Sequence, residues 1–204
     1  MKQPPGFFGY ENADEFFKNQ FNKIGGPVNW FYIGQLLKHS ADVIFGEFEK
    51  GWQAFLAAKD EPQTFEQLRQ WRVYMFLSGL ALENILKGIW VARDKKIIQD
   101  GKFSAQTKKG LHSLNWLVNQ INNLSPPSDQ ISLNQDEELL LEELTTFIRW
   151  AGRYPIPKRY QETIPRGFLG AKTGRQSVGP HSKQLIDKLF ERFTDMLKRE
   201  FKNV

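Results

Sequence analysis

The sequence predicts an all-α, single-domain bundle of about five helices. Its 204 residues suffice for one domain with a sizeable core, and 40% of them are hydrophobic, an ordinary share for a globular protein. Apolar residues recur in steps of three and four along five segments, while no stretch of a strand's length alternates with period two. With 17 Phe and 6 Trp, aromatic rings are expected to supply much of the core.

Two long helices are expected first. Residues 1–26, rich in Phe, Asn and Gly, predict an irregular N-terminal arm, either packed on the body or only partly ordered, and the bundle itself spans 27–204. Residues 29–58 have helical spacing, with Asn29 as the expected cap. Residues 64–94 are apolar on nearly all sides, which predicts a central, buried helix in which Gly79 lets another helix approach closely.

Three shorter helices follow a loop over residues 95–110. The first is expected within 111–127, with Leu114, Leu117, Val118 and Ile121 on its apolar face. The second is expected over 135–151, because three acids crowd its first turn, where the helix dipole favours them. The last is expected over 181–201, where large apolar residues recur every fourth position.

A long basic loop over residues 153–180 separates the last two helices. From Arg153 to Lys183 the chain has seven bases and one acid, a net charge of +6, which leaves −1 for the rest of a chain whose total is +5. Such a segment can contact phosphates while its rings stack on bases; the alternative is a passive, solvated loop lying against the acidic residues of the preceding helix. The expected phosphate-binding residues are Arg153, Tyr154, Lys158, Arg159, Arg166, Lys172 and Lys183.

Several chemistries are excluded by the residue types. The chain has no cysteine, so it has neither disulfides nor a thiolate nucleophile, and a reducing cytoplasm is the expected location. No signal peptide and no membrane span is expected. The stretch "GFLGAKTGRQSVG" lacks the spacing of a P-loop or a nucleophile elbow. Since none of the three histidines follows a glutamate at the Glu-x-x-His spacing, neither a metal nor a cofactor is expected.

Three polar residues are expected to stabilise the fold. Glu83 and Lys87 stand one turn apart on the most apolar helix, where an unpaired charge would be costly, so they are expected to hold each other or a chain terminus. His112 stands at the start of a helix and is expected to bond a backbone group or a neighbouring carboxylate.

Three stretches, taken in order, resemble the HEPN family of small helical bundles, which includes toxins, nucleases and partners of nucleotidyltransferases. They are "GLALENILKGIW" (79–90), "GLHSLNWLV" (110–118) and "WAGRYPIP" (150–157). Nucleolytic members carry Arg-x(4–6)-His before their last helix, and "RQSVGPH" matches this pattern with Arg175 and His181. The resemblance implies a homodimer that cuts RNA without metal, in which the histidine moves a proton and the arginine clamps the phosphate.

The functional expectation is therefore a protein that binds RNA or a nucleotide through its basic loop. Metal-independent RNA cleavage by Arg175 and His181, of toxin or defence type, is the catalytic form of this hypothesis. The alternative is a non-enzymatic partner, antitoxin-like or an adaptor, whose bundle docks a protein such as a nucleotidyltransferase.

Overall fold

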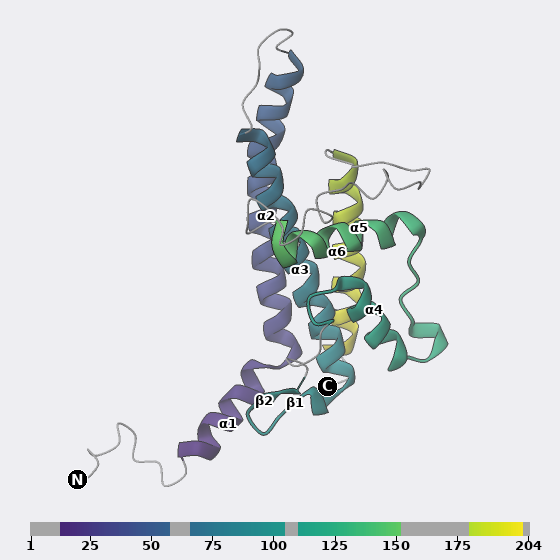
Figure 1. Ribbon diagram of the computed structural model, residues 1–204. Helices are drawn as coiled ribbons and strands as arrows, with labels where there is room; N and C mark the ends of the chain where they lie inside the picture. The colour runs from purple at the N-terminus through teal and green to yellow at the C-terminus, as the bar shows by residue number, and fades with distance from the viewer. Residues whose placement is uncertain (1–12, 58–65, 105–109, 152–179, 202–204) are drawn as a thin grey trace, which may run out of the picture.

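The computed structural model describes residues 13–57, 66–104, 110–151 and 180–201 and confirms the all-α prediction (Figure 1). Over these residues the chain forms a bundle of six α-helices. Their bounds are α1 Ala13–Ile24, α2 Pro27–Ala57, α3 Glu66–Arg93, α4 Leu114–Asn123, α5 Gln135–Thr146 and α6 Pro180–Phe201.

The two longest helices, α2 and α3, lie side by side (Figure 1). α3 is the centre of the bundle, because it also packs against α4, α5 and α6. Its Tyr74, Met75, Leu82 and Ile85 are fully shielded from solvent, which confirms the predicted buried helix. Burial of a Leu, Ile or Met side chain contributes roughly 1.5–3 kcal/mol relative to exposure, so α3 anchors the core.

Glycines let neighbouring elements approach α3 closely. A Cβ added to Gly79 would lie 2.9 Å from Cγ1 of Ile148, which confirms the close approach predicted at this position. On α2, a Cβ added to Gly34 would lie 2.7 Å from Cδ1 of Ile85. Side chains at these two positions would therefore require Ile148 or Ile85 to shift.

The N-terminal part differs from the sequence prediction in two ways. Residues 13–24 form α1, where an irregular arm was expected; acids occupy its first turn and a lysine its last, as the helix dipole favours, and Asp14 pairs with Lys18 at 2.6 Å. The expected cap at Asn29 is wrong, because α2 already begins at Pro27, a residue preorganised for a first helical turn. The Asn29 side chain instead donates to the Lys23 carbonyl at 3.3 Å.

The expected loop after α3 contains a small antiparallel hairpin. Its strands are β1 (Ile98–Gln99) and β2 (Lys102–Phe103), preceded by a 3₁₀ turn, η1 (Lys95–Ile97). Asp100 and Gly101 join the strands with φ of 53° and 69°, and Asp-Gly is a favoured pair for such a two-residue turn. The strands are too short to show alternation in the sequence.

The three remaining helices follow the predicted pattern. The four apolar residues predicted for α4 are all buried, and α5 begins with a capping box between Asn134 and Glu137. After Thr146 the last turn widens into a π-helix, η4 (Phe147–Ala151), whose final carbonyl accepts a hydrogen bond from Arg72 on α3 at 2.9 Å. In α6, Leu189, Phe193 and Leu197 are fully buried.

Residues 70–93 of α3 are long and apolar enough, by length and composition, to cross a membrane, although no such segment was expected. Within the bundle 72% of the most apolar window of this helix is buried. Neighbouring helices thus cover it, as is usual for a core helix.

Candidate functional site

The predicted binding and catalytic residues lie in the sequence between Arg153 and the first turn of α6, and one of their side chains is described. Residues 152–179, which include Arg153, Tyr154, Lys158, Arg159, Arg166, Lys172 and Arg175, lie outside the described residues. His181 is the second residue of α6, and its side chain lies outside the described part as well. Lys183, the last base of the segment, is described.

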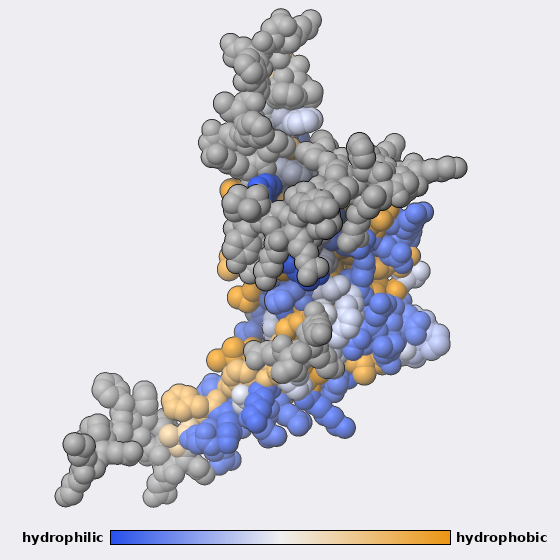
Figure 2. All heavy atoms as spheres, in the orientation of Figure 1, coloured by the Kyte–Doolittle hydropathy of each residue, from blue (hydrophilic) through white to orange (hydrophobic). Residues whose placement is uncertain are grey.

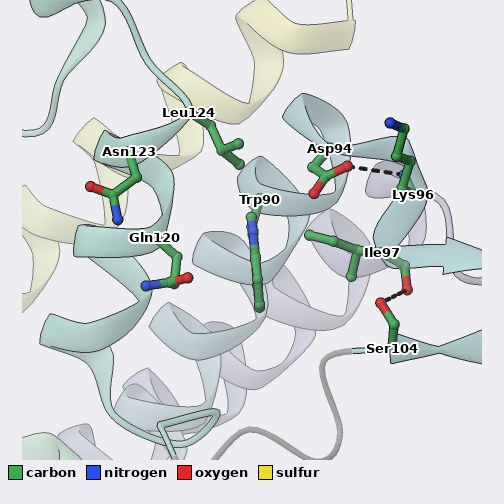
Figure 3. A pocket seen from close by; sticks show the side chains of 8 residues that line it. All are labelled: Trp90, Asp94, Lys96, Ile97, Ser104, Gln120, Asn123 and Leu124. Carbon is green, nitrogen blue, oxygen red and sulfur yellow. Dashed lines mark hydrogen bonds between the residues drawn. The ribbon is translucent and has the colours of Figure 1, made fainter.

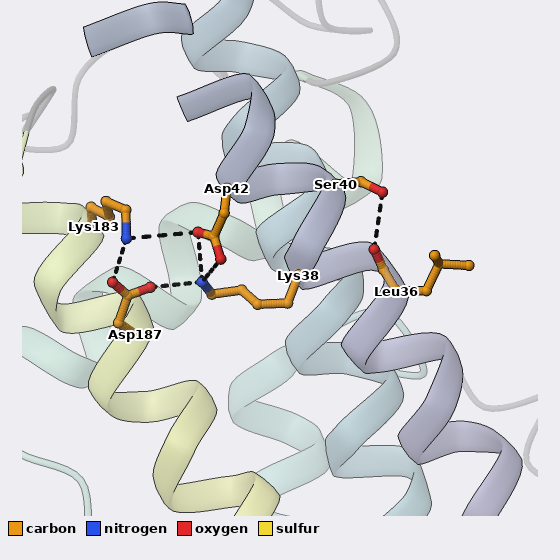
Figure 4. Close-up of polar contacts among 6 residues, drawn as sticks. All are labelled: Leu36, Lys38, Ser40, Asp42, Lys183 and Asp187. Carbon is orange, nitrogen blue, oxygen red and sulfur yellow. Dashed lines mark hydrogen bonds and ion pairs between the residues drawn. The ribbon is translucent and has the colours of Figure 1, made fainter. Parts of the chain in front are cut away.

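Lys183 belongs to a ring of four charges between α2 and α6 (Figure 4). Its Nζ lies 2.5 Å from Oδ2 of Asp187 and 3.7 Å from Oδ1 of Asp42. On the other side of the ring, Nζ of Lys38 lies 2.7 Å from Oδ2 of Asp42 and 2.7 Å from Oδ1 of Asp187. Two ammonium groups and two carboxylates therefore alternate, and the ring is neutral.

Two members of this ring, Asp187 and Lys183, have pKa values shifted toward their charged forms. Burial alone would raise the pKa of Asp187, but hydrogen bonds from Lys183 and Lys38 outweigh it and lower that pKa. Burial likewise opposes the charge of Lys183, yet the bonds to Asp187 and Asp42 raise its pKa overall. Lys183 is therefore a paired cation that holds α6 against α2, which leaves less of its charge for a ligand.

Beneath the ring, Tyr74 on α3 is fully buried. Burial, with the nearby Asp187 carboxylate, raises the pKa of its hydroxyl far above the usual value. The phenol stays protonated under all ordinary conditions, so it can donate a hydrogen bond but cannot serve as a base.

A groove of about 490 Å³ runs along α6 from this ring. It passes Phe190 and Thr194 and reaches Lys198 near the end of the helix. The Thr194 residue is only 4% exposed, and its hydroxyl has no hydrogen-bond partner among the described residues. The lining mixes both signs of charge, which does not single out an anionic ligand.

A second polar cluster joins α3 to the turn before α4. Nζ of Lys87 bonds Oε1 of Glu83, and both side chains are more than nine-tenths buried. Nδ1 of His112 lies 3.2 Å from both Glu83 oxygens, and its ring is 58% exposed. The Trp30 ring lies 5.8 Å from the Lys87 ammonium. The expected pairing is confirmed, and the buried charges satisfy each other.

A smaller hollow of about 200 Å³ lies between the end of α3, the hairpin and α4 (Figure 3). The Asp94 carboxylate there accepts a hydrogen bond from the Lys96 backbone N–H at 3.1 Å, and the Ser104 hydroxyl donates to the Ile97 carbonyl at 3.1 Å. These polar groups shape the chain itself. In the described residues no group of three His, Asp or Glu side chains is placed to hold a metal ion.

Sequence reasoning missed Lys38, Asp42 and Asp187. The i,i+4 spacing of Lys38 with Asp42, and of Lys183 with Asp187, marks each pair on its own helix. Nothing in the sequence shows that the two pairs face each other, because that depends on how α2 packs against α6.

The class that fold and site define is a helical bundle with a neutral ionic ring between α2 and α6, in which a basic segment precedes α6 in the sequence. Comparison of the chain with family models, curated proteins and solved structures finds no match. The resemblance to the HEPN family therefore rests on the three short motifs alone.

Proposed function

We propose that this protein binds RNA or a nucleotide through its basic segment, residues 153–183. The observation that carries the proposal is the net charge of +6 in this one stretch, against −1 for the rest of the chain. Local cationic charge attracts phosphates and supplies most of the affinity for nucleic acid without sequence preference. Because Asp42 and Asp187 already pair with Lys183, the six bases from Arg153 to Arg175 carry the binding.

The salt dependence gives this proposal a magnitude. In a plot of the logarithm of the binding constant against the logarithm of the salt concentration, each phosphate contact to a single strand contributes about −0.7 to the slope. If about five of the bases contact phosphates, the affinity falls on the order of 100-fold between about 50 and 200 mM salt.

The test measures fluorescence anisotropy of a labelled single-stranded RNA. A variant in which Lys158, Arg159, Arg166 and Lys172 are changed to Gln is expected to bind at least 10-fold more weakly and to lose over half of the salt slope. The control removes the same number of bases from exposed positions elsewhere: Lys95, Lys102, Lys188 and Arg199 to Gln. Equal losses in both variants would show that net charge, and not this segment, determines the binding.

The catalytic form of the proposal adds metal-independent RNA cleavage by Arg175 and His181. A histidine near neutral pH can take the proton of a 2′-hydroxyl, and an arginine can stabilise the charge that grows on the phosphate oxygens. The spacing of these two residues before α6 is what supports it.

A second candidate function is protein binding, as in the adaptor or antitoxin-like alternative. It is favoured by a specific observation: large apolar side chains of α1 and α2 remain exposed along one side of the bundle. Contiguous exposed apolar surface of this kind marks protein–protein contact.

A further inference from the structure

Nine large apolar side chains form a strip along α1 and the first half of α2. We define the outer strip as Phe16, Phe17, Phe21, Ile24, Val28, Tyr32, Ile33, Leu36 and Val43, which are 37–66% exposed. Within each helix most of them follow one another in steps of three or four, which gives α1 and α2 one exposed apolar face each. In the space-filling view, apolar spheres mark the edge of the molecule along α2, opposite α6 (Figure 2).

The α2 part of the outer strip carries no permanent charge. Between Ile24 and Gly46 the chain has two such groups, Lys38 and Asp42, and both turn toward α6 in the ionic ring. Its polar interruptions are small, chiefly Asn29 and His39. A second identical face could therefore approach without desolvating a fixed charge or opposing like charges.

Helix α1 contributes apolar side chains to the strip that remain exposed in the single chain. It has no buried residue, although its Phe17, Phe21 and Ile24 share one side. It projects from the foot of α2, away from α4, α5 and α6 (Figure 1). A helix of 12 residues is marginal in water by itself and normally depends on burying its apolar side. In the part of the chain that the structure describes this side stays largely exposed, and a second copy of the chain can cover it.

We propose that the outer strip is a homodimer interface in which the α2 helices of two copies pack antiparallel and each α1 reaches across the α2 of the other copy. This inference names the partner for the second candidate function and does not depend on polyanion binding. A two-fold contact is self-complementary, so the strip must match itself when reversed. With the axis near Leu36, Val28 of one copy faces Val43 of the second copy, and Tyr32 faces His39.

Charge complementarity extends this arrangement beyond the strip. In the same register, the Lys23 end of α1 comes near Glu47 and Glu49 of the second copy. These acids lie on the exposed part of α2, just past Val43. Glu47 already pairs with Lys50 of its own helix at 2.8 Å, so Glu47, Glu49 and Lys50 together carry one net negative charge. Lys23 meets that net charge where the apolar strip ends, which favours the antiparallel over the parallel register.

The available area suits a stable dimer. A large side chain that is about half exposed offers on the order of 100 Å². The nine residues of the outer strip thus offer on the order of 900 Å² per copy, close to the roughly 800 Å² per partner of a standard protein–protein interface.

The first test is the mass of the full chain in solution, by light scattering after size exclusion. The wild-type chain is expected to be dimeric at micromolar concentration and to remain so in about 0.5 M salt. Leu36→Glu should raise the dimer dissociation constant at least 10-fold, because it buries two like charges at the two-fold axis. Leu139→Glu, the same change at an exposed leucine of α5, should leave the dimer intact. A monomeric wild type, or equal effects of the two variants, overturns the proposal.

The second test uses the absence of cysteine from the chain. Leu36→Cys should form a disulfide-linked dimer in air, and Val28→Cys mixed with Val43→Cys should form a linked heterodimer. Leu139→Cys should not cross-link. A linked Leu139→Cys dimer, or unlinked Leu36→Cys with unchanged circular dichroism, contradicts the register. Pelleting of the wild type with anionic vesicles while it stays monomeric would assign the strip to membranes instead. Anisotropy of labelled RNA, measured on the same samples, tests the proposed RNA binding separately, so the failure of one proposal can be told from the failure of the other.

Discussion

Two carboxylates on neighbouring helices show how local surroundings decide the cost of a buried charge. Glu83 accepts hydrogen bonds from Lys87 and faces His112, so its charge is compensated where it is buried. Glu143 is in a different position, because burial raises its pKa to about 7. A carboxyl group in that state is neutral in part of the population at physiological pH.

Glu143 therefore makes stability depend on pH. In the unfolded chain it ionises near its usual value of 4.5, so between about pH 4.5 and 7 the native state holds more protons than the unfolded state. The free energy of unfolding should fall as pH rises through this window, by roughly 2 kcal/mol after allowance for partial exposure.

Urea denaturation at pH 5 and pH 8 checks this contribution. Glu143→Gln is expected to remove most of that fall and to be more stable than wild type at pH 8. Glu138→Gln, an exposed acid on the same helix, serves as the control and should keep the wild-type slope. A slope that survives Glu143→Gln would assign the pH dependence to other groups.

At the scale of elements, the packing of α2 against α3 depends on close approach at one glycine. Gly34→Ala puts a Cβ 2.7 Å from Ile85, whereas Gly46→Ala meets no atom within 4 Å. Alanine gains roughly 1 kcal/mol of helix propensity at either site, but overpacking costs about 1–3 kcal/mol at the first. Gly46→Ala should raise the melting temperature and Gly34→Ala should lower it or leave it unchanged. Thermal unfolding monitored by circular dichroism measures both melting temperatures. If both variants melt at a higher temperature than wild type, the α2–α3 interface accommodates the added methyl group without cost.

The same elements show what sequence could predict. Apolar periodicity located α2 through α6, and it selected all four buried residues of α4. It missed α1, although Phe17, Phe21 and Ile24 have helical spacing, because the Asn and Gly content of residues 1–26 favours an irregular arm. It also missed a hairpin whose strands have two residues each. The site was harder to predict from the sequence. Lys183 counts there as one more base of the basic segment, and only the fold shows that Asp42 of another helix lies beside it.

At the scale of the whole molecule, the outer strip and the ionic ring lie on opposite sides of α2. Lys38 and Asp42 face α6, while Leu36 and Val43 are exposed. A dimer formed through the outer strip therefore keeps the starts of the two α6 helices, and with them the two His181 residues, on its outer sides. The HEPN resemblance instead implies two copies meeting at a shared catalytic cleft. The two arrangements predict different behaviour for RNA cleavage.

Mixing inactive chains separates these arrangements. Arg175→Ala and His181→Ala should each reduce any cleavage of single-stranded RNA in EDTA at least 100-fold, while Arg199→Ala, an exposed base of α6, should not. In the outer-strip dimer each catalytic site consists of residues from one chain. Refolding the two inactive variants together should therefore not restore RNA cleavage. Likewise, Leu36→Glu should keep its affinity for a short RNA within about 3-fold. Recovery of cleavage in the mixture would place Arg175 of one copy beside His181 of another, because only a shared cleft can combine one intact residue from each chain.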